Sequence, residues 1–174
     1  MIMIDEIKKE IARSMNGVCA ARIRESGLGY KVTFGVDWVR LREIAAGYAK
    51  NYETAWSLWQ SDVREHKLIA TLLCPLDEMT RERLGEWMRG VFNRELAEIL
   101  SFALLSRKKE LIPDLMLMAE SDRDLERLTA YLALGRYRNF SNDLSDDELQ
   151  RVRENVRMED CKDIRFVHAI ENLF

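Results

Sequence analysis

Leu58-Trp59-Gln60-Ser61-Asp62-Val63-Arg64-Glu65-His66-Lys67-Leu68-Ile69-Ala70-Thr71-Leu72-Leu73 is the stretch that decides the fold. It is typical of the end of one amphipathic helix, a corner and the start of the next helix. Trp59 closes the first helix, and Ser61 is placed to cap the second, because its hydroxyl can accept a bond from an unpaired amide of the first turn. Apolar residues then recur every three or four positions, which predicts a buried stripe. Three charged side chains are expected to face solvent: Arg64, Glu65 and Lys67.

Two later stretches, residues 93–105 and 122–134, follow the same order. Each begins with a short polar cap, continues with charged residues and ends in an apolar run that contains small residues. The copies lie about 30 residues apart, a spacing typical of stacked supersecondary units. The sequence therefore predicts an all-α fold in which antiparallel helix pairs stack as a solenoid, with residues 1–174 forming a single domain.

Helical periodicity, caps and breakers divide the rest of the chain. The first helix, residues 3–24, is expected to bury a stripe formed by Ile4, Ile7, Ile11, Met15 and Val18. Residues 30–36 alternate like a strand but have no partner strand, so they are interpreted as an extended loop, and residues 139–144 are the one clear linker. The next expected helices span residues 38–49, 52–59, 63–73, 79–91, 94–105, 109–119 and 123–138. Ser145 and Glu148 form a capping box that opens a further helix, and the last helix is expected at residues 161–172.

The composition excludes several classes of protein. Hydrophobic residues make up 47% of the 174 residues and charged residues 33%, as in an ordinary globular domain, and only two prolines and eight glycines favour helix over sheet. No apolar run approaches the roughly 20 residues that a membrane span needs, so no membrane partner is expected. The net charge of −3 means that any contact with nucleic acid must come from a local basic patch.

The three cysteines and two histidines suggest neither disulfides nor a metal site. Cys19, Cys74 and Cys161 lie far apart, which fits a reducing, cytoplasmic setting. His66 and His168 have no neighbour at ligand spacing, so we expect no metal, no other cofactor and no catalytic histidine.

Several segments resemble the N-terminal half of the AlkD-type DNA alkylation repair proteins over about residues 30–135. They are Phe34-Gly35-Val36, Leu41-Arg42-Glu43-Ile44-Ala45 and Leu58-Trp59-Gln60-Ser61, followed by Glu65 and Ala70. That family is built of HEAT-like repeats, and its members remove alkylated, positively charged bases from DNA by cutting the glycosidic bond. The resemblance thus implies a HEAT-like α–α superhelix and a partner in double-stranded DNA.

The catalytic motif of this family is usually Asn-Trp-Asp-x-x-Asp, and it corresponds here to residues 93–98. Asn93 matches, Glu98 stands where the family has its functional aspartate, and Arg94 replaces the tryptophan. A second family position, an arginine pair followed by a small residue, is similar to the stretch beginning at Arg127, where only the first arginine is present.

These substitutions bear on the chemistry. An N-alkylated purine is already a cationic leaving group, so a carboxylate helps mainly by stabilising the developing oxocarbenium sugar or by orienting water. Glu98 is the candidate for this role, but its extra methylene displaces the charge, and Arg94 would repel a cationic base. The alternative is an ordinary helix glutamate paired with Arg94 one turn away. The motif therefore favours DNA binding over efficient excision.

Six basic residues are the candidates for contacts with phosphate: Arg64, Arg94, Arg107, Lys108, Lys109 and Arg127. Backbone charge supplies most of the non-specific affinity for DNA, but each residue also fits an ordinary solvated surface. The rival to DNA binding is a non-enzymatic scaffold that holds a protein or peptide, and the sequence leaves the oligomeric state open. The four tryptophans are expected to pack between helices rather than stack on bases.

Overall fold

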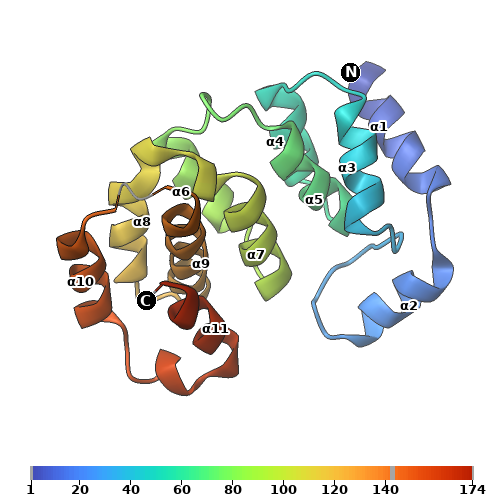
Figure 1. Ribbon diagram of the computed structural model, residues 1–174. Coiled ribbons are helices and arrows are strands. Elements are labelled where there is room, and N and C mark those ends of the chain that lie inside the picture. The colour runs from blue at the N-terminus through green and yellow to red at the C-terminus, as the bar shows by residue number, and fades with distance from the viewer. Residues whose placement is uncertain (1, 142–143, 174) are drawn as a thin grey trace. The chain divides into compact units, whose positions relative to one another are not determined.

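The computed structural model describes residues 2–141 and 144–173, and all regular elements in these ranges are helices (Figure 1). The predicted all-α class is confirmed. The chain divides into two compact units, Met1–Met79 and Thr80–Phe174. This division does not test whether residues 1–174 form a single domain, so that statement stays a prediction.

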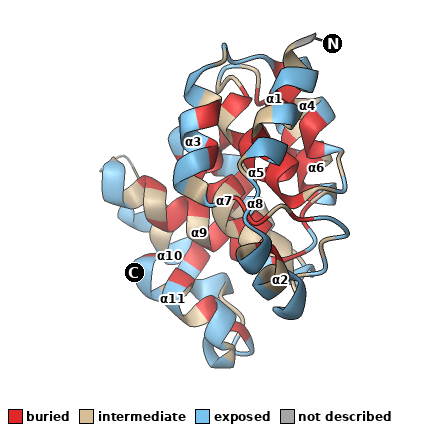
Figure 2. Cartoon of the chain, turned by 90° about the vertical axis from the view of Figure 1, so that its right-hand side faces the viewer, coloured by how far each residue is buried: buried red, intermediate tan, exposed pale blue. Residues whose placement is uncertain are grey.

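The first unit contains five helices: α1 (Ile2–Arg13), α2 (Gly17–Glu25), α3 (Trp38–Ala46), α4 (Tyr52–Trp59) and α5 (Arg64–Leu73). Helix α5 packs against both α4 and α3. All of its residues except Leu72 are buried (red in Figure 2). The core of this unit therefore surrounds α5, the helix that the deciding stretch predicts.

The second unit also surrounds one central helix, but it contains more helices than the first. They are α6 (Arg81–Arg89), α7 (Arg94–Ala103), the short 3₁₀ helices η1 (Leu105–Arg107) and η2 (Lys109–Leu111), α8 (Ile112–Ala119), α9 (Asp124–Phe140), α10 (Asp146–Asn155), the 3₁₀ helix η3 (Asp160–Lys162) and α11 (Ile164–Leu173). Helix α9 is central and packs against α7, α8 and α11. At Gly135 a Cβ would lie 3.2 Å from the backbone of Asn172, so a glycine lets α11 approach α9 closely.

Local signals locate several elements well. Helix α4 begins and ends where the sequence predicts, and residues 30–36 form an extended loop with a single bridge between Val32 and Val63. The capping box of Ser145 and Glu148 is present at the start of α10. Trp59 and Trp87 are fully buried, as expected for residues that pack between helices.

The prediction of one continuous helix over residues 3–24 is wrong. The chain breaks after α1, and Asn16 starts a new helix, because its side chain accepts a hydrogen bond from the amide of Cys19 while its own amide donates to the carbonyl of Phe34. The apolar stripe ends with the break: Met15 and Val18, predicted to be buried, are 61% and 66% exposed.

The prediction that the charged residues of α5 face solvent is also wrong: Arg64, Glu65 and Lys67 are all buried. Ser61 does not cap the helix in the predicted way. Val63 is the N-cap residue, and the Ser61 hydroxyl accepts the Val63 amide and pairs with Nδ1 of His66.

The predicted linker at 139–144 starts later than expected. Helix α9 continues through Phe140, and its C-cap is Ser141. Residues 142–143 of the predicted linker lie outside the described residues.

Candidate functional site

The segment that matches the catalytic motif lies at the start of α7. Asn93 is the N-cap, and its side-chain oxygen accepts a hydrogen bond from the Leu96 amide at 2.9 Å. This bond satisfies one of the amides that the first helical turn leaves unpaired. The asparagine of the motif therefore has a structural task here.

Arg94 and Glu98 form an ion pair one turn apart on α7. The Arg94 Nε lies 2.6 Å from a Glu98 carboxylate oxygen, and the two side chains are 42% and 40% exposed. A guanidinium in direct contact neutralises much of the field that a carboxylate could direct at a developing cationic sugar. The geometry thus matches the ion-pair alternative for Glu98, and its role in catalysis stays a prediction.

Glu65, which the sequence assigned to the surface, is a completely buried hydrogen-bond acceptor. Its carboxylate accepts from the Thr33 hydroxyl at 3.0 Å, from the amide of Phe34 at 3.0 Å and from the amide of Gly35 at 2.9 Å. Arg64 adds a charged bond at 3.1 Å. The carboxylate thereby holds the extended loop against α5, and a buried charge with this many donors is well compensated.

Glycine is required at the centre of the loop that Glu65 holds. Gly35 has a φ of +73°, and a Cβ there would lie only 2.3 Å from the carbonyl oxygen of Asn16. No other residue fits such a close backbone approach. The resemblance between Phe34-Gly35-Val36 and Glu65 in the sequence thus reflects one physical unit, a glycine-containing loop bound to a buried carboxylate.

Arg64 belongs to this unit rather than to the surface. It is 8% exposed, and its guanidinium donates to the Val36 carbonyl at 3.1 Å as well as to Glu65. Because its guanidinium is occupied inside the first unit, we leave Arg64 out of the proposed DNA contacts.

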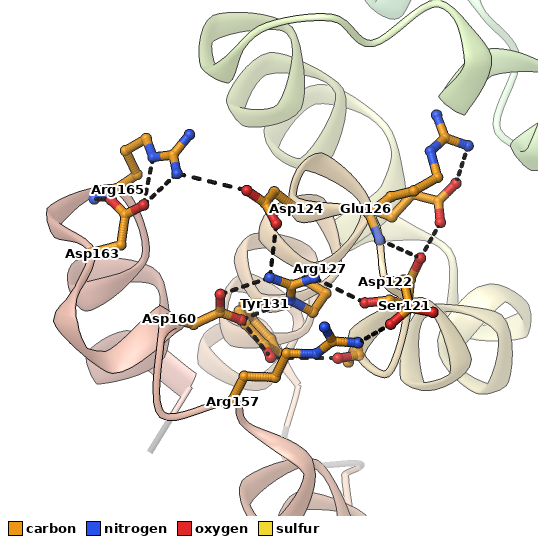
Figure 3. Close-up of polar contacts among 12 residues, drawn as sticks. Ser121, Asp122, Asp124, Glu126, Arg127, Tyr131, Arg157, Asp160, Asp163 and Arg165 are labelled. Atoms are coloured by element: carbon orange, nitrogen blue, oxygen red, sulfur yellow. Dashed lines mark hydrogen bonds and ion pairs between the residues drawn. The ribbon is translucent and has the colours of Figure 1, made fainter.

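Arg127 lies at the centre of a second buried cluster, at the start of α9 (Figure 3). Its Nε and Nη2 each donate to the Asp160 carboxylate at 2.8 Å, and its Nη1 donates to the Ser121 carbonyl at 3.0 Å. Both Arg127 and Asp160 are 3% exposed. Asp124 accepts a further bond at 2.9 Å. This bidentate pair ties α9 to the chain that leads into α11, and Arg127 too is left out of the proposed DNA contacts.

The charges of this cluster stabilise one another. The hydrogen bonds to Asp160 raise the pKa of Arg127 above its ordinary value. Burial, followed by the negative charge of Asp160, raises the pKa of Tyr131, whose hydroxyl lies 3.4 Å from the same carboxylate. Each shift keeps its side chain in the protonated form, which is the donor that Asp160 needs.

The three remaining candidates are consecutive in the turn between α7 and α8. Arg107 ends η1, Lys108 follows, and Lys109 begins η2. Arg107 and Lys109 are exposed, and Lys108 is half-buried. These three residues are called the basic turn below, and like Arg94 they reach the surface.

Two further features are not found among the described residues. No group of three or more His, Cys, Asp or Glu side chains among them could hold a metal ion. Within the same ranges, no helix is both long and apolar enough to cross a membrane.

The sequence model of one family, described as DNA alkylation repair enzyme, matches residues 6–161. The chain belongs to this family. The match covers most of both compact units, from α1 to η3. The family resemblance inferred from the sequence is therefore confirmed.

A solved structure supports the fold assignment of this DNA alkylation repair family member. It is described as a new family of proteins related to the HEAT-like repeat DNA glycosylases with affinity for branched DNA structures. It has a TM-score of 0.84 and 16% sequence identity, and the match covers 98% of this chain and 73% of that chain. The predicted HEAT-like fold is thus confirmed. No curated protein matches the chain.

Sequence reasoning missed the acceptors at the centres of both buried clusters. Asp160 follows Arg127 by 33 residues, and nothing local marks it as a partner. A signal for Glu65 was present in the sequence. Residues 30–36 have no partner strand, so their amides need another acceptor, and a carboxylate such as Glu65 can supply one. His66, to which we assigned no catalytic role, is buried, and burial lowers its pKa to about 4.

Proposed function

We propose that this protein binds DNA through its backbone phosphates, with the basic turn of Arg107, Lys108 and Lys109 as the principal contact and Arg94 as a secondary one. The observation that carries the proposal is the family match over residues 6–161. The related solved structure is described as having affinity for branched DNA, and we extend that affinity to this protein, with a preference for branched DNA over intact duplex.

The charge distribution supports phosphate contacts at the basic turn. The chain has a net charge of −3, so attraction to a polyanion depends on a local excess of cations. Residues 107–109 are three consecutive cations, and Glu110 is the single carboxylate beside them. Such contacts hold a duplex in register but do not read its sequence.

Excision of alkylated bases is proposed to be weak or lost. Glu98, the candidate carboxylate, is paired with Arg94 at 2.6 Å. Arg94 also stands where the family resemblance expects an aromatic side chain, so a cationic base would meet a guanidinium there. We expect little release of N-alkylated purines from methylated duplex DNA, and Glu98→Gln should leave that low level unchanged. Rapid release by the native protein that is lost in Glu98→Gln would instead establish a glycosylase.

Binding itself is tested by fluorescence anisotropy with a labelled duplex and a labelled three-way junction at 50 and 200 mM salt. Because phosphate contacts release counterions, affinity for both DNAs should fall steeply with salt, and the junction should be bound more tightly. No binding to either DNA at 50 mM salt would overturn the proposal and would favour a protein or peptide partner.

We also propose that the protein is located in the cytoplasm.

A further inference from the structure

A pocket in the second unit lies beside the basic turn. It has a volume of about 380 Å³, near the lower end of the roughly 300–1,000 Å³ that small-ligand sites usually occupy. Its lining residues come from α7, η1 and the end of α9: Phe102, Ser106, Arg107, Tyr137, Phe140 and Ser141. All six belong to the same compact unit.

The walls of this pocket are aromatic. Phe102, Tyr137 and Phe140 contribute three rings, and Tyr137 and Phe140 are one helical turn apart on the same face of α9. Tyr137 is buried, whereas Phe140 at the rim is 77% exposed. A phenylalanine this exposed adds little to the stability of the fold, but it offers a flat apolar surface to a ligand.

Cations stand at the edge of the aromatic walls. Arg107 lines the pocket and is exposed, and Lys108 and Lys109 follow it directly. The Arg136 guanidinium lies 4.4 Å from the centre of the Phe102 ring. A ligand that combines a flat ring with a negative charge is complementary to this combination.

The two serines give the pocket a preference for hydrogen-bond donors. The Ser106 hydroxyl donates to the Phe102 carbonyl at 3.4 Å, and the Ser141 hydroxyl donates to the Tyr137 carbonyl at 3.1 Å. A hydroxyl that donates its proton to a backbone carbonyl can act only as an acceptor toward a ligand. An exocyclic amino group of a nucleobase is such a donor.

We propose that this pocket binds an unpaired nucleobase of DNA, stacked on Phe140, with the adjoining phosphate held by Arg107. The proposal rests on the proposed DNA binding and deepens it. Unpaired bases occur at branch points and bulges but not within an intact duplex, so the pocket supplies a physical reason for a preference for branched DNA. The base is read by its flat face and its amino group, which fits adenine, cytosine and guanine better than thymine.

The test compares two bulged duplexes that differ at one position. One carries a single unpaired adenine, and the other carries an abasic site at the same place, so that the phosphates are identical. Stacking of a base on an aromatic side chain is worth roughly a fivefold to hundredfold gain in affinity. The native protein should therefore bind the adenine bulge at least about fivefold more tightly than the abasic bulge, as measured by anisotropy.

Variants separate the pocket from general DNA binding. Phe140→Ala should bring the ratio of the two affinities close to one while leaving the affinity for the abasic bulge unchanged. Arg107→Gln should weaken binding of both DNAs. Met158→Ala is the matched control, because Met158 is also 77% exposed and lies in the same unit but outside the pocket, and it should keep the native ratio.

A second measurement needs no variant. With 2-aminopurine as the unpaired base, stacking on Phe140 should quench its fluorescence on binding.

Equal affinity of the native protein for the adenine and abasic bulges, or a ratio that survives in Phe140→Ala, would overturn the pocket proposal while DNA binding stands. Absence of binding to every DNA would overturn both proposals.

Discussion

The starts of α5 and α9 differ from the start of α7 in the burial of their arginine, although all three sequences have the same order of polar cap, charged residues and apolar run. At α5 and α9 the arginine is buried and contacts a distant segment: Arg64 donates to the Val36 carbonyl, and Arg127 donates to Asp160. At α7 the arginine is half exposed and pairs with a carboxylate on its own helix. The local pattern locates a helix start, but partners about 30 residues away decide whether its charges serve the fold or the surface.

This difference assigns separate tasks to the basic residues. An arginine that is paired and buried stabilises its unit, whereas a lysine or arginine in an exposed turn contributes little to stability. The predictions below separate the two classes, beginning with the largest expected effect on the free energy of unfolding.

Removal of the buried acceptor in the first unit should be the most damaging change. Glu65→Ala leaves Arg64 buried without its carboxylate and strips the acceptors from the amides of residues 34 and 35. We expect the free energy of unfolding to fall by about 3–5 kcal/mol in urea denaturation. Glu43→Ala, which removes an exposed carboxylate of the same unit, should cost less than about 1 kcal/mol. Equal losses in the two variants would contradict the structural role of Glu65.

In the second unit, Asp160→Asn should cost about 3 kcal/mol, because it breaks a bidentate pair and leaves the Arg127 guanidinium buried without its main counter-charge. The matched variant is Asp124→Asn, since Asp124 contacts the same guanidinium but is 55% exposed. It should cost under about 1 kcal/mol. Both losses are measured by urea unfolding. A larger loss in Asp124→Asn than in Asp160→Asn would contradict the role of Asp160 as the main counter-charge of Arg127.

Acid should weaken the protein through His66. Its pKa is about 4 in the folded state, against an ordinary 6.5, chiefly because of burial and also because of the charge of Lys8. Between pH 6.5 and pH 4 the unfolded chain therefore binds a proton that the folded protein does not, so the free energy of unfolding falls as the pH falls. We expect this to amount to about 2 kcal/mol between pH 7 and pH 4.5.

The contribution of His66 can be isolated by substitution. His66→Gln should lose less stability over the same pH interval than the native protein, measured by urea unfolding at both pH values. An identical loss in the two proteins would assign the acid sensitivity to other groups.

The exposed pair of α7 should give the smallest effect on stability. Arg94→Gln and Glu98→Gln should each change the free energy of unfolding by less than about 0.5 kcal/mol, because an exposed pair one helical turn apart is screened by solvent. Thermal unfolding of both variants at low and high salt measures this. A loss comparable with that of Asp160→Asn would show that the pair supports the fold.

Much of the fold could be predicted from the sequence, because its signals are local. The apolar spacing at residues 68–73, the proline after Cys74 and the capping box at Ser145 each act within a few residues. The break after α1 was missed although its N-cap, Asn16, is a local signal; only the second contact, between the Asn16 amide and the Phe34 carbonyl, depends on a distant segment.

The candidate site could be predicted only in part, for the same reason. The basic turn is contiguous, so three charges in a row identify it in the sequence. The burial of Arg64 and Arg127 depends on the loop at residues 33–36 and on Asp160, and the aromatic pocket depends on Phe102 and Phe140 from different helices. Contacts between segments this far apart leave no periodic trace in a single sequence.

The salt dependence of DNA affinity tests most directly the claim that the basic turn, and not the buried arginines, contacts phosphate. The native protein is compared with the triple variant Arg107→Gln, Lys108→Gln and Lys109→Gln, and with Arg151→Gln as an exposed control in the same unit. Each phosphate contact contributes about 0.9 to the slope of log affinity against log salt, so the triple variant should lower the slope by about 2–3 while its fold and stability are unchanged. A triple variant that keeps the native slope and affinity would contradict the account.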